Sequence, residues 1–217
     1  IRNTISDLLS NNGFNEAMNN SLTKGGYTGL IFELDAAQNI EILNPLSQDL
    51  NVMRQSLLFS GLENIAYNQN RKNTDIKVYE FGKTYHKTED GNIENQHLQI
   101  LISGRLKIEN WNANDDKANF FFIKEKVEHI LNRLGVKKIK SKSINSYGFS
   151  EGLMYAFKNK RVVCFGKLEK KLCKSFGVKS EVYAADFNWD LILGLLGHKK
   201  TKYQEVSKFP EVRRDLS

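Results

Sequence analysis

Cysteine is scarce in this sequence, which contains Cys164 and Cys173 and no others. The two thiols have neither the CxxC spacing of zinc sites nor the density of a disulfide framework, so we expect neither feature. Cys164, in an apolar stretch, is expected to be an inert core thiol. No apolar run approaches the roughly 20 residues that cross a bilayer, and the first residues are polar, unlike a secretory signal. The sequence therefore predicts a soluble protein of the reducing cytoplasm, without a membrane partner.

Catalytic signatures are missing as well. The chain has no Walker-type GxxxxGK motif and no GxGxxG, HExxH or GxSxG pattern. Its carboxylate pairs, Asp115–Asp116 and Glu89–Asp90, stand in loop-like stretches where helix capping and solubility explain them. Its histidines have no carboxylate or cysteine at ligand spacing; they are His86, His97, His129 and His198. We therefore predict no catalytic residue, no cofactor-binding residue and no metal ligand.

The chain does carry a modest excess of positive charge, with 32 Lys and Arg against 25 Asp and Glu and a net charge of +7. Such a balance favours acidic partners such as nucleic acid. Both signs are interspersed, however, and basic runs of this kind usually form solvated faces. A basic RNA-binding module without enzymatic role is the alternative interpretation. It would be supported if two segments formed neighbouring strands and so gathered Lys137, Lys138, Lys140 and Lys142 with Lys158, Lys160 and Arg161.

Apolar periodicity predicts an α+β fold, in which helices flank an antiparallel sheet. Helices are expected over residues 1–12, for about four turns from 56, from the Asp115–Asp116 cap to Gly135, and over 168–176. Strands are expected over residues 39–43, 76–81, 98–103, 153–157, 162–166 and 182–187. Because helical periodicity begins at the first residue without a capping residue before it, we expect the sequence to be a piece of a longer protein.

Three blocks of the sequence resemble the β subunit of bacterial phenylalanyl-tRNA synthetase. They are NPLS at 44–47 with MRQSLL at 53–58, GL at 61–62 and NQNR at 68–71; VYEFGKTY at 78–85; and KFPEVRRDL at 208–216. The blocks occur in the family's order over nearly the whole chain. The resemblance implies a synthetase-like module over residues 1–196. Residues 197–217 would then be a linker and the start of the C-terminal ferredoxin-fold anticodon-binding domain.

The resemblance also implies a class II synthetase catalytic-like fold that has lost its activity. In the family's catalytic subunit, the strand similar to residues 82–85 is followed by an arginine that holds the α-phosphate of ATP, and this chain has His86 there. The glycine-rich GxGxGxxR segment of a class II ATP site is absent too. A neutral imidazole cannot replace a bidentate guanidinium. Adenylation by this chain alone is not expected, and ATP and Mg are expected only for the holoenzyme.

The partners that the resemblance implies are the α subunit, in an (αβ)2 heterotetramer, and tRNA. The block over residues 44–71 corresponds to the class II dimerisation motif, so its apolar stripe and flanking arginines are interface candidates. These candidates are Arg54, Leu57, Leu58, Gly61, Leu62, Ile65 and Arg71. An amphipathic helix can equally cover its own sheet, and that interpretation stays open. A free-standing class II-like metabolic enzyme is the third possibility, but none of the eight arginines has a phosphate-binding context.

Overall fold

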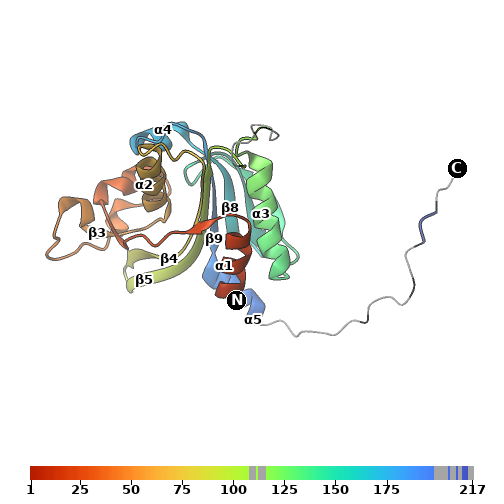
Figure 1. The fold of residues 1–217 in the computed structure, drawn as a ribbon. Helices are drawn as coiled ribbons and strands as arrows, with labels where there is room; N and C mark the ends of the chain where they lie inside the picture. Colours follow the sequence, from red (N-terminus) through yellow and green to blue (C-terminus); the bar gives the residue numbers. More distant parts are fainter. Residues whose placement is uncertain (108–110, 112–115, 198–204, 206–208, 210–211, 215–217) are drawn as a thin grey trace.

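The computed structural model describes residues 1–107, 111, 116–197, 205, 209 and 212–214. A seven-stranded sheet in the order β1-β4-β5-β9-β8-β7-β6 runs through its centre (Figure 1). The strands are β1 (Asn15–Glu16), β4 (Ile76–Thr88), β5 (Gly91–Ser103), β6 (Lys140–Ile144), β7 (Phe149–Phe157), β8 (Lys160–Leu168) and β9 (Val182–Asn188). All neighbours are antiparallel except β1, which pairs with β4 in parallel. The sheet is therefore mixed, whereas the sequence predicts a purely antiparallel one.

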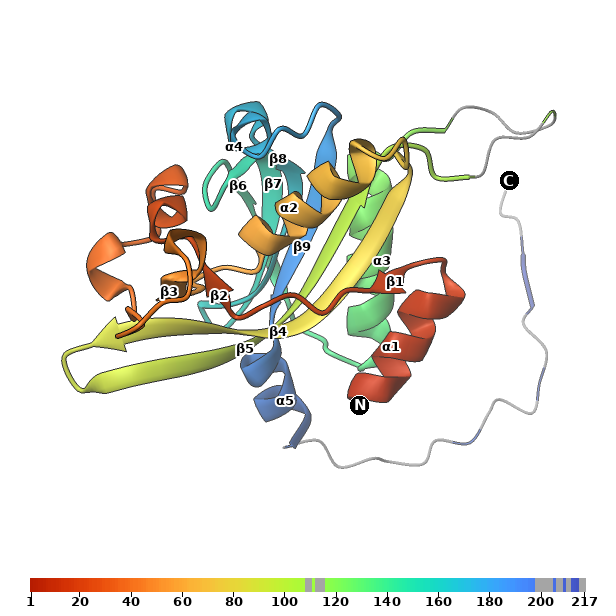
Figure 2. The ribbon, with the colours of Figure 1, turned by 60° about the vertical axis from the view of Figure 1, so that its left-hand side comes forward.

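Helices cover both faces of this sheet (Figures 1 and 2). One face carries α1 (Arg2–Asn11), α3 (Phe120–Arg133) and α5 (Trp189–Gly197), and the other carries α2 (Leu58–Gln69) and α4 (Lys170–Ser175). The segment between β1 and α2 forms a lobe beside α2, built from short elements. These are β2 (Leu22–Thr23), η1 (Gly25–Leu30), η2 (Ala36–Gln38), η3 (Gln48–Leu50) and β3 (Val52–Met53). Two hydrophobic cores result, one on each face of the sheet.

The helix ends follow local chemistry. Helix α3 begins where the Asn119 side chain accepts a hydrogen bond from the Phe122 backbone N–H at 3.0 Å. It ends before Gly135, whose φ of +64° is the left-handed conformation that glycine adopts most easily. The predicted terminator is confirmed. The predicted cap is wrong, because Asn119 lies next to the first helical turn, Asp116 precedes it, and Asp115 lies outside the described residues.

The β4–β5 hairpin is much longer than the sequence predicts. Each strand has 13 residues, and the two pair from Ile76↔Ser103 to the turn at Thr88↔Gly91. The apolar alternation that predicts strands over 76–81 and 98–103 covers the half of the hairpin that packs into the cores. Polar residues form the other half, so hydrophobic periodicity does not reveal it. The hairpin carries one side of the site described below.

Three further differences concern shorter segments. Residues 39–43 form no strand, since Glu41 makes only an isolated bridge to Val52. Strand β6 and helix α5 were not predicted: β6 is an edge strand rich in Lys and Ser, and α5 follows β9 without a break. The predicted linker and the KFPEVRRDL block lie largely outside the described residues. As predicted, Cys164 is a core thiol, and burial raises its pKa to about 12.

Candidate functional site

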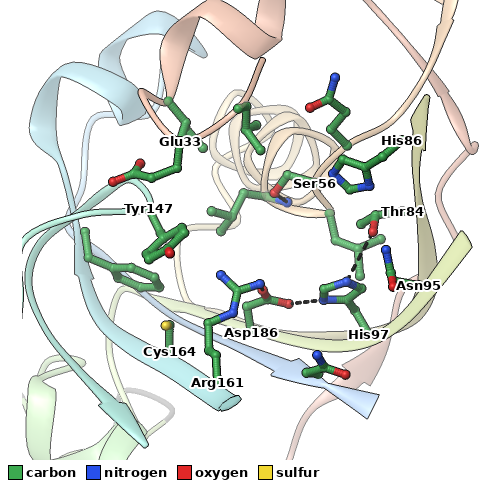
Figure 3. Close-up of a pocket in the computed structure, with 17 residues that line it drawn as sticks. Glu33, Ser56, Thr84, His86, Asn95, His97, Tyr147, Arg161, Cys164 and Asp186 are labelled. Atoms are coloured by element: carbon green, nitrogen blue, oxygen red, sulfur yellow. Dashed lines mark hydrogen bonds and ion pairs between the residues drawn. The ribbon is translucent and has the colours of Figure 1, made fainter. Parts of the chain in front are cut away.

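A cavity of about 280 Å³ opens between the sheet and the lobe (Figure 3). It lies on the α2 face of the sheet, toward the turn of the β4–β5 hairpin. Cross-strand partners share a face of the sheet, and the registers Thr84↔Asn95, Gly82↔His97 and Cys164↔Asp186 bring polar side chains from four strands to this cavity. These side chains meet because alternate residues of a strand point to the same face of the sheet, and no sequence motif is needed to bring them together.

A chain of hydrogen bonds crosses the floor of the cavity. The Thr84 hydroxyl lies 3.2 Å from His97 Nε2, and His97 Nδ1 lies 2.8 Å from Asp186 Oδ1 (Figure 3). The order hydroxyl, imidazole, carboxylate is that of a nucleophile relay. Thr84 is only 2% exposed, however, so its hydroxyl offers almost no surface to a substrate. The chain of bonds fixes the positions of these side chains and does not present a nucleophile.

Asp186 carries the negative charge of this network. Burial raises the pKa of its carboxyl, but the charge and hydrogen bond of His97, together with the Arg161 guanidinium, outweigh burial and hold the pKa below its usual value. Arg161 Nη2 lies 3.7 Å from Asp186 Oδ2, and the guanidinium also lies over the Tyr147 ring at 4.8 Å from its centroid. The one arginine of the cavity is therefore paired with a carboxylate of its own chain.

His86 stands where the resemblance places a phosphate-binding arginine in the catalytic subunit. Its side chain is half-buried, and Nδ1 is buried without a hydrogen-bond partner. Burial, followed by repulsion from His97 and Arg161, lowers the pKa of His86 below its usual value. The imidazole is thus neutral at physiological pH and supplies no fixed cation.

The charge balance of the cavity disfavours a polyphosphate. Arg161 is the one Lys or Arg among the described lining residues, and it is paired with the carboxylate of Asp186. A phosphate-binding site needs cationic donors that are free to contact the ligand. No group of three His, Cys, Asp or Glu residues in the described part of the chain is arranged to hold a metal ion. The lining therefore forms a polar pocket whose one cation is already paired.

The predicted interface residues lie elsewhere, and the structure corrects most of them. Six of the seven are buried inside this chain, and the five with side chains have relative exposures of 4% or less. These six are Arg54, Leu57, Leu58, Gly61, Leu62 and Ile65. A Cβ added to Gly61 would overlap Leu101 of β5, so the glycine lets α2 approach the chain's own sheet. Buried side chains offer no area to a partner, and the alternative that this helix covers its own sheet is the correct one for these six.

Arg54 has a structural role instead. Its Nη1 donates to Glu80 Oε1 at 2.7 Å, with side-chain exposures of 3% and 5%. Its Nε donates to the Lys83 carbonyl oxygen at 3.0 Å, so Arg54 ties the entry of α2 to β4. Gly82 leaves room for the guanidinium, since a Cβ there would overlap Arg54 Nη2. Arg71 is exposed, with its guanidinium 3.4 Å from the centroid of the Tyr67 ring, and its role at an interface stays a prediction.

The lobe presents the apolar surface that sequence reasoning missed. Phe32, Leu43 and Leu46 have relative exposures of 97% or more, although none belongs to a helix or strand. Leu46 is part of the NPLS block, so the signal was present in the motif itself. Helical periodicity instead indicates the apolar stripe of α2, whose side chains are apolar because they are buried in the core of this chain.

Comparisons with known proteins agree with this geometry. The family model described as the phenylalanyl tRNA synthetase beta chain CLM domain matches residues 1–189. A phenylalanine–tRNA ligase beta subunit from Bacteroides fragilis is 38% identical over the whole chain, and one from Fusobacterium nucleatum is 35% identical over 97% of it. The chain spans 28% and 27% of these two relatives.

Solved structures bear on the fold alone, because their sequence identity is low. A pyrrolysyl-tRNA synthetase from Desulfitobacterium hafniense matches with a TM-score of 0.68 at 12% identity, covering 89% of this chain and 67% of that one. This likeness confirms the predicted α+β, class II synthetase-like fold. None of the helices within the described residues is long and apolar enough to cross a membrane. On its family match and its relatives, the chain belongs to the CLM-domain family of phenylalanyl-tRNA synthetase β chains.

Proposed function

We propose that this chain is the non-catalytic assembly module of a cytoplasmic phenylalanyl-tRNA synthetase β subunit. It supports the ATP-dependent attachment of phenylalanine to its tRNA by an (αβ)2 holoenzyme, whose ATP and Mg bind outside this chain. The observation that carries the proposal is the cavity itself: its one arginine is paired with Asp186, and His86 is neutral. The family match and the names of the relatives support the β-subunit assignment.

The surface that contacts the α subunit is the exposed apolar part of the lobe. Phe32, Leu43 and Leu46 leave large side chains in water, and such side chains gain free energy when a partner covers them, at roughly 25 cal/mol per Å². The neighbouring Gln55 side chain braces the lobe by donating to the Asp35 carbonyl oxygen and to Asn39 Oδ1, both at 2.8 Å. The apolar side chains are thus carried on a braced segment.

The test replaces the three exposed side chains with serine in a full-length β subunit co-expressed with its α subunit. We expect the Phe32→Ser, Leu43→Ser, Leu46→Ser variant to lose the heterotetramer in a mass measurement. Phe121→Ser is the matched control, because Phe121 is 77% exposed but lies on α3, on the opposite face of the sheet. A triple variant that assembles like the wild type would overturn the proposed surface.

A second measurement tests the absence of catalysis directly. The purified chain is expected to show no phenylalanine-dependent ATP–pyrophosphate exchange. Exchange above background that is lost in Arg161→Leu would contradict the proposal, since it would show that the arginine is free to bind nucleotide.

A further inference from the structure

Six lysines gather at one corner of the sheet. Strand β6 pairs with β7 through Lys140↔Ala156 and Lys142↔Met154, and the β7–β8 turn follows directly after Ala156 and Phe157. The two lysine-bearing segments are therefore neighbours in space, with β6, β7 and β8 side by side (Figure 2). We call this group the lysine corner; it consists of Lys137, Lys138, Lys140, Lys142, Lys158 and Lys160. Arg161, grouped with these lysines by the sequence, turns into the cavity instead.

The lysine corner has little negative charge nearby. Residues 130–150 and 152–168 contain no Asp or Glu. All six lysines are exposed, and none forms an ion pair within the described residues. Glu151 lies in β7 beyond the Ile144↔Gly152 pair, away from the Lys140↔Ala156 end of the two strands. Glu128 on α3 accepts a hydrogen bond from the Tyr155 hydroxyl at 2.9 Å and lies 3.8 Å from Lys124. The corner therefore keeps its positive charge.

Two of the lysines occupy backbone positions that do not favour them. Lys138 has a φ of +62° and Lys158 a φ of +44°, in the left-handed region where glycine and asparagine are common. A non-glycine residue there costs of order 1 kcal/mol or more, and such residues cluster where function requires the side chain.

We propose that the lysine corner binds the sugar–phosphate backbone of a folded RNA. Lysine is a point charge that contacts phosphates without reading bases, so the contact is independent of sequence. Lys140 and Lys142 lie about 6.7 Å apart along an edge strand, and such a linear array suits an extended polyanion. The inference is independent of the assembly surface, because no residue of the lobe contributes to it.

Lysines on an edge strand have another known use, which is to prevent pairing with the edge of a second sheet. Substitution by glutamate separates the two roles. Glutamate keeps the edge charged and unpaired, but it repels phosphate. Glutamine at the same positions removes the charge without reversing it, and it serves as the second variant if the glutamate variant fails to fold.

The experiment uses the full-length β subunit assembled with its α subunit and a fluorescent transcript of the tRNA for phenylalanine. Lys140, Lys142, Lys158 and Lys160 are replaced together by glutamine or by glutamate, and binding is measured by anisotropy across a salt series. Each lost phosphate contact lowers the slope of log affinity against log salt by about 0.9, so the glutamine variant should lose about 3 to 4 units of slope. The change in affinity between low and physiological salt should then shrink on the order of 100-fold.

The matched control removes the same charge elsewhere. Lys87, Lys171, Lys174 and Lys179 are exposed and outside the corner, and none forms an ion pair within the part of the chain that the structure describes. Their glutamine variant should keep at least three quarters of the wild-type slope. Equal losses in both variants, or no loss in the corner variant, would overturn the proposal.

Two further outcomes are informative. Binding of polyglutamate to the wild type that the corner variant loses, with tRNA binding unchanged, would assign the corner to an acidic polypeptide and overturn the RNA contact. The mass of each complex is measured on the same samples, so a failure of assembly is recognised separately from a failure of the lysine corner.

Discussion

The two faces of the sheet differ in what they bury. The face under α1, α3 and α5 is largely apolar, with Phe165 and Phe187 fully buried in one core. The α2 face is apolar only beneath α2 and α4, and toward the hairpin turn it becomes polar. Strand β4 shows this change from apolar to polar along the residues that point to the α2 face. On that face the apolar Val78 is followed by Glu80, Thr84 and His86.

This difference places the polar cavity on one face of the sheet. Buried polar groups destabilise a fold unless they find partners. On the α2 face nearly all of them do, and the two buried side-chain atoms left without a partner in the described residues, Gln55 Oε1 and His86 Nδ1, both belong to residues lining the cavity. The cavity is a polar pocket in which Asp186 is paired with both His97 and Arg161.

The largest expected effect comes from breaking the buried ion pair of the polar face. Arg54→Met leaves Glu80 buried with Asn19 as its remaining side-chain partner, at 2.7 Å. Removing one member of a buried pair costs about 3 to 5 kcal/mol. Urea denaturation of the purified chain measures the loss. The control is Arg2→Met on the apolar face, whose pair with Glu16 is exposed and worth at most about 1 kcal/mol. Equal losses would mean that burial does not distinguish the two pairs.

A smaller effect tests the packing of α2 against the sheet. A Cβ at Gly61 would overlap Leu101 and touch Gln99, so Gly61→Ala should lower the free energy of unfolding by about 1 to 3 kcal/mol. Gly194 in α5 has no atom within 4 Å of such a Cβ, so Gly194→Ala should raise it by roughly 0.5 to 1 kcal/mol. Thermal unfolding of the two variants checks the signs. A stabilised Gly61→Ala variant would restore the interpretation that this glycine faces a partner.

The sequence predicts the elements whose buried residues are apolar, and it fails where polar residues are structural. Helices α1 and α3 and strands β8 and β9 follow from periodicity, because their buried faces are apolar. The outer half of the hairpin and the Lys-rich β6 are stabilised by pairing with neighbouring strands, which no local pattern encodes. The class II fold is predicted from the resemblance of the three sequence blocks to the family. The strand order of a mixed sheet cannot be derived from the propensities of single residues.

The site was the least predictable part. The position of His86 in a sequence block singles it out, and its lowered pKa agrees with the expectation that it does not bind phosphate. The sequence does not connect His97 with Asp186, because they lie 89 positions apart and are brought together by the pairing of β5 with β9. The apolar stripe of α2 gives interface candidates from the sequence but leaves open that the helix covers its own sheet, because amphipathicity does not tell whose core a helix joins.

The smallest expected effect is a difference between the two faces of the sheet in how the free energy of unfolding depends on pH. Burial and the nearby His97 and Arg161 lower the pKa of His86 in the folded chain below its usual 6.5. As pH falls through 6.5, the unfolded chain therefore takes up a proton at this position before the folded chain does, and stability decreases until the folded pKa is reached. Above that window the contribution is constant. The pKa of Asp186 is also lowered, but its contribution is lost only below 3.8, in a separate window.

Replacing His86 with glutamine removes this proton uptake and should flatten the dependence of the unfolding free energy on pH between about 7.5 and 5. The control is His129→Gln, because His129 is exposed on α3, on the apolar face, and its ring is not part of the cavity. Denaturant midpoints measured across this pH range for the wild type and both variants provide the comparison. If the wild type and His86→Gln lose stability in parallel as the pH falls, the buried imidazole is not the group that titrates, and the neutral state assigned to it in the cavity is wrong.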